Sequence, residues 1–508
     1  MSNSQTRGPG VCLDARRVPS DTVLDVALGG ARVTLGEAPG WREQIEQSRR
    51  HLERMLDEGA RIYGVSTGVG NSSFHAIDRE GLVAHARSVM QQHGCGVGEP
   101  FSEIEARAVV FARLVSLSKG LSGVRFSLLE ALAALLNHDI APAIPRFGSV
   151  GASGDLTPLS YVAAAIAGER EVYYRGRIVA AEQALAEEGL RPFRFAPKET
   201  LAVMNGTSVM TAVGILTTAR FEAIIELAEQ ASALAVELLF GRSQPFDARI
   251  HAAKPHPGQV ESASRIGRAL AGSRLVDPPI SEGRPVQDRY SLRCSPHVLG
   301  AARDAVAWAR QLLEIELNSA NDNPLIDADR GEVLFGGNFF GGHPAIAMDL
   351  VKIAAASVAD LVDRQFALLV DRHDNMGLPE TLVAYDGCGV KGLQMTCSAL
   401  TALAVQRSAS DTVLSRSTEC ANQDKVSMGL NAAVNASESV GYLSNALAAE
   451  LIALSNAAAL RDQCRVSPAG RSLLAHVRSL SPVLSEDRRL DTDIARVAAS
   501  IAKRPGRE

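Results

Sequence analysis

The sequence lacks the patterns that mark several large classes of protein. Its 508 residues include seven cysteines, an odd number, and no two of them form a CxxC pair. A disulfide framework or a zinc site is therefore not expected, and a reducing, cytoplasmic compartment fits. The spacings HExxH and GxxxxGK[ST] are also absent. Their absence argues against a metalloprotease and a P-loop nucleotide site, and no bound metal is expected.

Charge of one sign is not concentrated anywhere in the chain. Lysine and arginine total 52 against 57 aspartates and glutamates, the formal net charge is -5, and the basic residues are scattered. Without a basic face, neither a nucleic acid nor an anionic membrane is expected as a partner. The short basic group of Lys503, Arg504 and Arg507 is expected to be a frayed terminus.

Long apolar runs are scarce. The first ten residues, MSNSQTRGPG, contain none, so no signal peptide is expected. The longest uncharged stretch, residues 201–219, is long enough to span a membrane. It also carries Asn205, Thr207, Ser208 and Thr211 and has no flanking basic cluster. These features favour a buried helix within a large helical protein over a membrane span.

Apolar residues recur at three- and four-residue steps through most of the chain, which predicts a mainly α fold. Helices are expected at residues 41–59, 101–118, 125–137, 199–239, 295–318, 348–369 and 427–459, and a strand hairpin at 171–179. We expect a mixed N-terminal region at residues 1–200, a bundle of long helices at 201–480 and a C-terminal tail at 481–508. The polar segment 278–288 is expected to be an exposed loop.

Four glycine-rich segments interrupt the helical pattern. They are YGVSTGVG from residue 63, GCGVGEP from residue 94, RFGSVGASGDLTPLS from residue 146 and FGGNFFGGHP from residue 335. Loops held between rigid helices are where binding and catalytic residues are usually found. These segments are therefore the first places to look for function.

The third of these segments contains Ala152-Ser153-Gly154, a tripeptide suited to backbone cyclisation. Gly154 has no side chain, so its amide nitrogen can approach the carbonyl carbon of Ala152. The hydroxyl of Ser153 can leave as water. Ring closure with two dehydrations would give a 4-methylidene-imidazol-5-one, an electrophile that no ordinary side chain supplies, so no external cofactor would be needed. The plainer alternative is a helix entry, with Asp155 as the N-cap of a helix over residues 156–167.

The longer pattern GSVGASGDLTPLS, at residues 148–160, resembles the signature of the histidine/phenylalanine ammonia-lyase family. The resemblance extends from about residue 63 to about residue 470. It implies the elimination of ammonia from an aromatic amino acid to give an arylacrylate, with Tyr63 as the base and Arg293 as the partner of the substrate carboxylate. The implied catalytic residues are Tyr63, Ala152, Ser153, Gly154, Asn205, Tyr290 and Arg293. The implied substrate-binding residues are Gln92, His93, Gln287, Phe339, Glu419 and Gln423.

The residues expected around the substrate ring favour tyrosine. In this family the two residues before GxG shape the ring pocket, and here they are Gln92 and His93. An imidazole can form a hydrogen bond with a polar ring. Gln423 stands where histidine lyases typically have glutamate, and this favours tyrosine over histidine, with phenylalanine also open. The sequence departs from the family pattern at Val69, His297, Phe340 and Lys425, so a non-standard aromatic substrate also stays open.

Two further alternatives concern the reaction itself. An aminomutase would use the same electrophile and base but would return ammonia to the β-carbon and give a β-amino acid. A helical assembly or binding protein without catalysis is the other alternative, and the retention of Tyr63, Ser153 and Arg293 counts against it. The resemblance also implies a fumarase/aspartase-like bundle of long helices and a homotetramer in which each site takes residues from three subunits.

Overall fold

The structure is a computed structural model that describes residues 10–279 and 286–501. The expected basic terminus and most of the expected loop at 278–288 lie outside these residues. The chain forms two compact units, each built from separate stretches of sequence. The first contains Met1–Leu216, Arg310–Asp349 and Ser410–Val434, and the second contains Thr217–Ala309, Leu350–Ala409 and Asn435–Glu508. The division expected at residues 200 and 480 stays a prediction.

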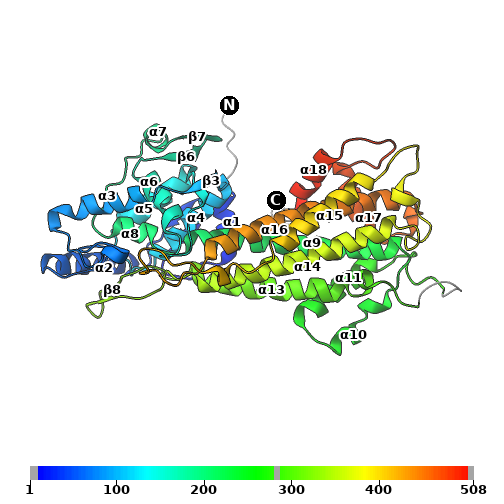
Figure 1. The fold of residues 1–508 in the computed structure, drawn as a ribbon, viewed down its shortest axis with the longest axis horizontal. Coiled ribbons are helices and arrows are strands. Elements are labelled where there is room, and N and C mark those ends of the chain that lie inside the picture. Colours follow the sequence, from blue (N-terminus) through cyan, green and yellow to red (C-terminus); the bar gives the residue numbers. More distant parts are fainter. Residues whose placement is uncertain (1–9, 280–285, 502–508) are drawn as a thin grey trace. The chain divides into compact units, whose positions relative to one another are not determined.

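The first unit holds the strands and most of the short helices (Figure 1). Its helices are α1 (Ser20–Ala27), α2 (Trp41–Asp57), α3 (Leu82–Gln92), α4 (Glu103–Leu117), α5 (Phe126–Asn137), α6 (Leu156–Ile166), α7 (Ala181–Glu187) and α8 (Glu199–Met204). Its strands are β1 (Val11–Leu13), β2 (Val33–Leu35), β3 (Val97–Pro100), β4 (Ile140–Pro142), β5 (Pro145–Phe147), β6 (Glu171–Tyr174), β7 (Arg177–Ala180), β8 (Leu325–Asp327) and β9 (Glu332–Leu334). β1 pairs with β2 in parallel, whereas the β3–β5, β4–β6, β6–β7 and β8–β9 pairs are antiparallel. The hairpin predicted at residues 171–179 is confirmed by β6 and β7.

Helix α4 forms the centre of the first unit. Every residue from Ala106 to Leu117 is buried, and the helix packs against α1, α5 and β4. Its start is fixed by a capping box, in which the hydroxyl of Ser102 accepts a hydrogen bond from the backbone of Glu105 while the Glu105 carboxylate accepts one from the backbone of Ser102. A helix buried on all sides in this way lies in the middle of the core, and the arginines that it buries, Arg107 and Arg113, are hydrogen-bonded.

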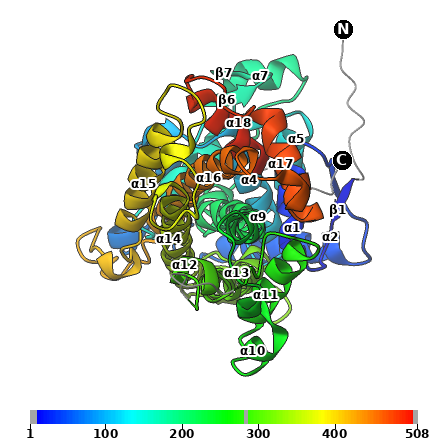
Figure 2. The ribbon, with the colours of Figure 1, turned by 90° about the vertical axis from the view of Figure 1, so that its right-hand side faces the viewer.

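Four long helices each contribute to both units: α9 (Ser208–Leu238), α13 (Ser295–Leu317), α14 (Gly342–Val370) and α16 (Gly429–Ala459). The second unit also contains α10 (Ala248–Ala252), α11 (Pro257–Leu270), α12 (Tyr290–Arg293), α15 (Lys391–Gln406), α17 (Pro468–Leu480) and α18 (Asp491–Ile501). Figure 2 shows the second-unit part of α9 enclosed by α13, α14 and α16. Glu229 of α9 pairs with Arg303 of α13 at 2.6 Å, and Ser232 of α9 accepts from Gln365 of α14 at 2.9 Å. These contacts confirm a bundle of long helices.

Helix α9 covers much of the stretch considered above as a membrane span. It is the only helix within residues 10–279 and 286–501 that is long and apolar enough to cross a membrane by length and composition. Of its most apolar 18-residue window, 72% is buried inside the protein. Burial of this kind is what the core helix of a large helical protein shows.

The single helix predicted over residues 199–239 is wrong at one point, where the chain leaves the helix between α8 and α9. Asn205 adopts an extended conformation, and Gly206 pairs in parallel with Gly154. The carbonyl of Gly206 accepts from the backbone of Asp155 at 2.7 Å, and its N–H donates to the carbonyl of Ser153 at 3.2 Å. The helix therefore breaks because its backbone is paired with the Ala-Ser-Gly segment.

Candidate active site

The loop of residues 148–155, here called the Ala-Ser-Gly loop, has an unusual backbone. Ser153 has φ +49° and Gly154 has φ +71°, both in the left-handed region. A serine in this region carries a steric cost that neighbouring contacts must offset, and such residues cluster at functional sites. The loop is held from within, since the hydroxyl of Ser149 donates to the carbonyl of Gly154 and accepts from the backbone of Gly151, both at 3.0 Å.

Close packing leaves no room for side chains at two glycines of this loop. A Cβ atom on Gly154 would lie 2.2 Å from the carbonyl oxygen of Gly206. A Cβ atom on Gly151 would lie 2.3 Å from the hydroxyl oxygen of Ser427. Next to Ser427, the N–H of Met428 donates to the carbonyl of Val150 at 3.0 Å. The loop therefore packs closely against two segments that are distant in the sequence, one at Gly206 and one at residues 427–428. Only glycine at positions 151 and 154 leaves room for these contacts.

Asp155, at the end of the loop, is the N-cap residue of α6, and its backbone carbonyl accepts from Leu159 at 2.9 Å. Its side chain makes no capping bond to α6, and its Oδ2 instead accepts from the first backbone N–H groups of α9, those of Val209 at 2.8 Å and Met210 at 2.9 Å. Burial raises the pKa of this carboxyl to about 7. Asp155 therefore occupies the N-cap position expected from the sequence, but its side chain ties the Ala-Ser-Gly loop to α9 instead of capping α6.

A cavity of about 50 Å³ opens beside Ser153. It is lined by Tyr63, Val69, Gly70, Val89, Ser153, Leu156, Leu201, Asn205, Asn323, Phe339, Glu419 and Gln423. The structure therefore brings six of the expected site residues to one cavity, although they come from three separate stretches of the first unit: Tyr63, Ser153, Asn205, Phe339, Glu419 and Gln423. Small-molecule pockets typically measure roughly 300–1,000 Å³. The cavity of this single chain is smaller than that range.

Tyr63 reaches this cavity with a defined hydrogen bond. Its phenolic oxygen accepts from the backbone N–H of Gly70 at 2.8 Å. Burial raises the pKa of Tyr63, the Gly70 N–H lowers it, and the charge of Glu419 raises it further. The Gly70 N–H is a donor that stabilises a phenolate, which is the form a tyrosine base requires.

Glu419 is held on a strained turn next to Tyr63. Glu419, Cys420 and Ala421 have φ values of +49°, +52° and +64°, three consecutive left-handed residues. The Glu419 carboxylate accepts from the backbone N–H of Asn71 at 3.3 Å. A Cβ atom on Gly70 would lie 1.4 Å from Oε2 of Glu419, so only glycine at position 70 permits this approach.

Gln423 closes the same turn. Its side-chain oxygen accepts from the hydroxyl of Thr418 at 2.6 Å, and the two residues also exchange backbone hydrogen bonds at 3.1 and 3.3 Å. These bonds hold both ends of residues 418–423, so that Glu419 and Gln423 face the cavity from one rigid turn.

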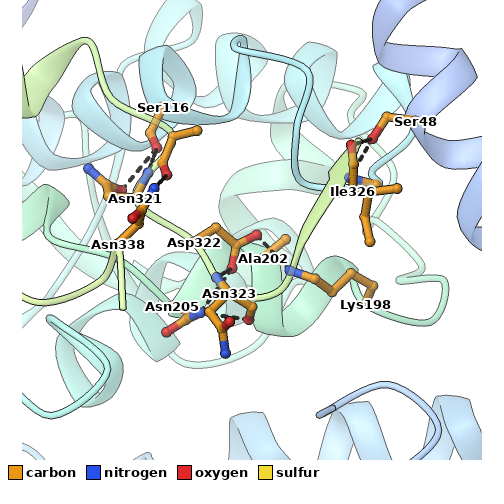
Figure 3. A network of polar contacts seen from close by, with 12 residues as sticks. Ser48, Ser116, Lys198, Ala202, Asn205, Asn321, Asp322, Asn323, Ile326 and Asn338 are labelled. Atoms are coloured by element: carbon orange, nitrogen blue, oxygen red, sulfur yellow. Dashed lines mark hydrogen bonds and ion pairs between the residues drawn. The ribbon is translucent and has the colours of Figure 1, made fainter. Parts of the chain in front are cut away.

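Asn205 belongs to a buried polar network below the cavity. Figure 3 shows Lys198, Asn205 and Asn323 gathered around Asp322. The Asp322 carboxylate accepts from Lys198 at 2.6 Å, from the Asn205 amide at 2.9 Å and from the backbone of Asn323 at 2.7 Å. Both members of the Lys198–Asp322 ion pair are fully buried. A buried pair that is fully hydrogen-bonded fixes its neighbours, and here it fixes the Asn205 amide.

Arg113 supports the same network from α4. Its guanidinium is fully buried and donates to the side chain of Asn321 at 2.8 Å and to the carbonyl of Ala202. Burial lowers the pKa of Arg113 to about 10. A Cβ atom on Gly206 would lie 2.1 Å from this guanidinium, so the helix break sits directly against it.

Gln92 and His93 lie at the end of α3 and do not line the cavity. Gln92 is exposed. His93 is partly buried, and its Nδ1 lies 2.7 Å from the carbonyl oxygen of Val89, a residue that does line the cavity. Since a carbonyl only accepts, Nδ1 must carry the proton of this bond. In the neutral imidazole, Nε2 is then a hydrogen-bond acceptor.

Gln287, Tyr290 and Arg293 belong to the second unit. They line a pocket of about 510 Å³ made entirely of second-unit residues, including Arg242 and Asp374. Tyr290 is 72% exposed, and the guanidinium carbon of Arg293 lies 4.4 Å from the centre of its ring. The Nε–H of Arg293 donates to the carbonyl of Asp288 at 3.1 Å. These three expected site residues therefore line one pocket in common, and it is a different pocket from the cavity beside Ser153.

The four departures from the family pattern fall in different places. Val69 lines the cavity beside Ser153. Phe340 is 39% exposed, and Lys425 is also exposed. His297 lies in the second unit with its ring centre 5.6 Å from that of His251. Only Val69 is thus in direct contact with the cavity described here.

Sequence reasoning missed several residues of the site. The aliphatic lining residues Val89 and Leu201 belong to no motif, and Lys198 and Arg113 have partners far away in the sequence. Within residues 10–279 and 286–501, no group of three His, Cys, Asp or Glu side chains is arranged to hold a metal ion. The seven cysteines are free thiols.

Comparisons with known proteins, by family model, by sequence and by structure, all point to one family. Residues 19–479 match the model of the aromatic amino acid lyase family. The chain is 41% identical over 452 residues to a histidine ammonia-lyase of Geobacillus kaustophilus, covering 88% of this chain and 89% of the relative. It is 37% identical over 494 residues to a histidine ammonia-lyase of Myxococcus xanthus, covering 96% of each. Among solved structures, a tyrosine aminomutase of Streptomyces globisporus superposes with a TM-score of 0.91, at 37% identity and with 97% of each chain covered. The chain belongs to the aromatic amino acid lyase family.

Proposed function

We propose that this protein eliminates ammonia from an aromatic L-amino acid, with tyrosine as the preferred substrate. The reaction would use a methylidene-imidazolone formed from Ala152, Ser153 and Gly154. The observation that carries the proposal is that Ser153, in a left-handed conformation, lines one cavity with Tyr63 and Glu419. An electrophile precursor, a base and a carboxylate suited to the substrate ammonium group thus line one cavity.

The residues present fit such a group. Gly154 approaches the carbonyl of Gly206 so closely that a Cβ atom would lie at 2.2 Å, and the chain on both sides of the tripeptide is held by Ser149 and Met428. Compression of this kind favours the attack of a backbone nitrogen on a carbonyl two residues earlier. Once formed, the group supplies an electrophilic carbon that converts the substrate amine into a leaving group.

The side chains around the loop have distinct parts in this mechanism. Tyr63 accepts the proton from the substrate β-carbon, and the Gly70 N–H, 2.8 Å from its oxygen, stabilises the phenolate that must first form. The Glu419 carboxylate is suited to the substrate ammonium group, to which its charge is complementary. Asn205, fixed by Asp322, orients the substrate within the cavity.

The charge of Glu419 should also set the pH dependence of the reaction. Because Glu419 raises the pKa of Tyr63, a higher pH is needed to form the phenolate. Glu419→Gln removes this charge, so the rising limb of kcat/KM against pH should move to lower pH, even though ammonium binding weakens. The control is Asp424→Asn, which removes a charge from the same exposed segment. An unmoved limb in Glu419→Gln would show that Tyr63 does not titrate as the base.

His93 supplies the reason to prefer a polar ring. Its Nδ1–H is committed to the Val89 carbonyl, which leaves Nε2 as an acceptor. The phenol of tyrosine or the N–H of an imidazole can donate to it, whereas phenylalanine leaves it without a partner. In a closed site, an acceptor left without a donor costs free energy, and this is how a site rejects an analogue that lacks a hydroxyl.

Replacing His93 with phenylalanine should therefore change the substrate preference. We expect the ratio of kcat/KM for tyrosine over phenylalanine to fall about tenfold, the size of one neutral hydrogen bond. Steady-state kinetics with both amino acids measures the ratio. His85→Phe, on the same helix, is the matched control and should leave it unchanged. A parent-like ratio in His93→Phe would remove His93 from ring recognition.

Two other functions have specific support. The curated relatives named above are histidine ammonia-lyases, and an imidazole ring could donate to His93 as a phenol does. The solved structure at 37% identity is a tyrosine aminomutase. Gln423 favours tyrosine over histidine, because an amide in place of a carboxylate lacks the charge that would attract an imidazolium ring.

One experiment separates these functions. The purified protein is incubated separately with L-tyrosine, L-phenylalanine and L-histidine, and the arylacrylate, free ammonia and β-amino acid are measured by chromatography. Acrylate with an equal amount of ammonia, mainly from tyrosine, is the expected result. The same products mainly from histidine would make the protein a histidine ammonia-lyase. A β-amino acid with little ammonia would make it an aminomutase, and no product from any of the three would contradict the proposal.

We also propose that the protein acts as a homotetramer in which subunits share their sites. Tyr290 and Arg293 line a pocket of the second unit rather than the cavity beside Ser153, yet a carboxylate partner is needed at that cavity. A guanidinium from another subunit would supply it, and would also lower the pKa of Tyr63. Helix α15 carries the exposed apolar side chains Met395, Leu403 and Val405, as a helix covered by another subunit would.

A further inference from the structure

The end of α3, which delivers His93, is held by a residue that no motif identifies. The guanidinium of Arg170 donates from Nη2 to the carbonyl of Met90 at 2.8 Å and from Nη1 to the hydroxyl of Ser160 at 2.9 Å. The buried hydroxyl of Ser160 lies 2.7 Å from the carbonyl of Thr157 and 3.1 Å from the carbonyl of His93. Arg170 thus reaches the backbone of α3 both directly and through Ser160.

The chain is shaped to receive this guanidinium. A Cβ atom on Gly94 would lie 2.6 Å from Nη2 of Arg170 and 3.0 Å from its guanidinium carbon, so a side chain after His93 would displace the guanidinium from this position. The guanidinium carbon also lies 4.4 Å from the centre of the Tyr161 ring. Arg170 itself has φ +64°, at the start of β6. A backbone in the left-handed region costs free energy for an arginine, and the hydrogen bonds of its guanidinium can offset that cost.

The contacts of Arg170 fall on the turn of α3 that orients the imidazole. Val89 and Met90 are neighbours in the sequence, and the carbonyl of Val89 accepts from His93 while that of Met90 accepts from Arg170. A cation at this position is also favoured by the partial negative charge of a helix C-terminus. The planar fork of arginine can hold two acceptors at once, which lysine cannot do.

We propose that Arg170 is a positioning residue for recognition of the substrate ring. It fixes the last turn of α3, and through Ser160 the backbone of His93, so that the Nε2 acceptor of His93 meets a polar ring in one orientation. This inference rests on the proposed function, in which His93 selects the ring. Arg170 does not touch the substrate and acts only through α3.

The test uses the full-length protein in its native assembly and compares Arg170→Met, Arg170→Lys and Ser160→Ala. The readout is the ratio of kcat/KM for the polar-ring amino acid that the parent prefers, tyrosine or histidine, over that for phenylalanine. Arg170→Met should lower the ratio about tenfold, because the lost hydrogen bonds free the His93 imidazole. Arg170→Lys, which keeps the charge and one donor, should recover part of it. Arg87→Met, which removes a mostly exposed arginine from α3, should leave the ratio unchanged.

Loss of stability alone would lower both kcat/KM values together, so the ratio separates positioning from folding. An unchanged ratio in Arg170→Met, with a parent-like Tm, would overturn the inference. If that variant does not fold, Ser160→Ala decides by the same criterion, since it keeps Arg170 and removes the hydroxyl through which the guanidinium reaches the His93 carbonyl. If His93→Phe shifts the ratio and Arg170→Met does not, this inference alone fails. If neither shifts the ratio, ring recognition by His93 fails with it.

Discussion

Ser153→Ala is expected to reduce the turnover of every substrate at least about a thousandfold, because a loss of more than about 4 kcal/mol of transition-state stabilisation follows when the electrophile cannot form. The hydroxyl of Ser153 is the only group in the tripeptide that can leave to create the methylidene carbon. Alanine at this position removes only the hydroxyl oxygen and faces the same left-handed conformation. The fold should therefore be preserved, with a Tm close to that of the parent.

Mass spectrometry of the intact protein gives the direct measurement. The parent should be lighter than its sequence by two water molecules, and Ser153→Ala should have the full mass of its own sequence. Full activity in this variant, or a parent with no mass deficit that is nevertheless active, would remove the electrophile from the mechanism. Tyr63→Phe is the matched control, because it should keep the mass deficit.

Tyr63→Phe is expected to lower kcat by about a hundred- to ten-thousandfold, the usual contribution of a general base. Phenylalanine fills the same space but cannot accept the proton from the β-carbon. It also leaves the N–H of Gly70 without the acceptor that now lies 2.8 Å away. The loss should appear in kcat more than in KM, since the phenol acts in the transition state.

A second tyrosine serves as the control for this result. Tyr173 donates its hydroxyl proton to the carbonyl of Phe101 at 2.9 Å and does not line the cavity. Tyr173→Phe should therefore leave kcat close to that of the parent. A Tyr63→Phe protein with parent-like kcat and an intact mass deficit would assign the base to another residue.

Helical periodicity predicts the architecture well because it reports local burial. Residues 41–59 and 125–137 were expected as helices, and α2 and α5 end within two residues of those limits. Helix α14 begins earlier than expected, at Gly342, since glycine and histidine at its start mask the apolar pattern. The break at Asn205 was not predictable, because its cause is the pairing of Gly206 with Gly154 rather than any local preference.

The residues of the site could be predicted only where a motif names them. Tyr63, Ser153, Asn205, Glu419 and Gln423 come from glycine-rich or polar segments, and the structure gathers them at one cavity. Periodicity alone would have assigned none of them.

The supporting network has no such local pattern. Lys198 and Asp322 are separated by 124 residues and look like two unrelated surface charges in the sequence, yet both are fully buried as a pair. Likewise, Arg170 precedes a strand and carries no motif, although it holds the end of α3. Contacts of this kind arise from chain topology, which a single sequence does not display.

The way the Ala-Ser-Gly loop is held has a consequence for protein synthesis. Gly151 packs against Ser427, and the N–H of Met428 holds the carbonyl of Val150, so one wall of the loop is the last part of the first unit to leave the ribosome. While the chain is growing, Ser153 has long been translated but lacks the segment that compresses it. Under the proposed function, the reactive carbon would form only late in biosynthesis, and a nascent or prematurely terminated chain would carry an unmodified serine.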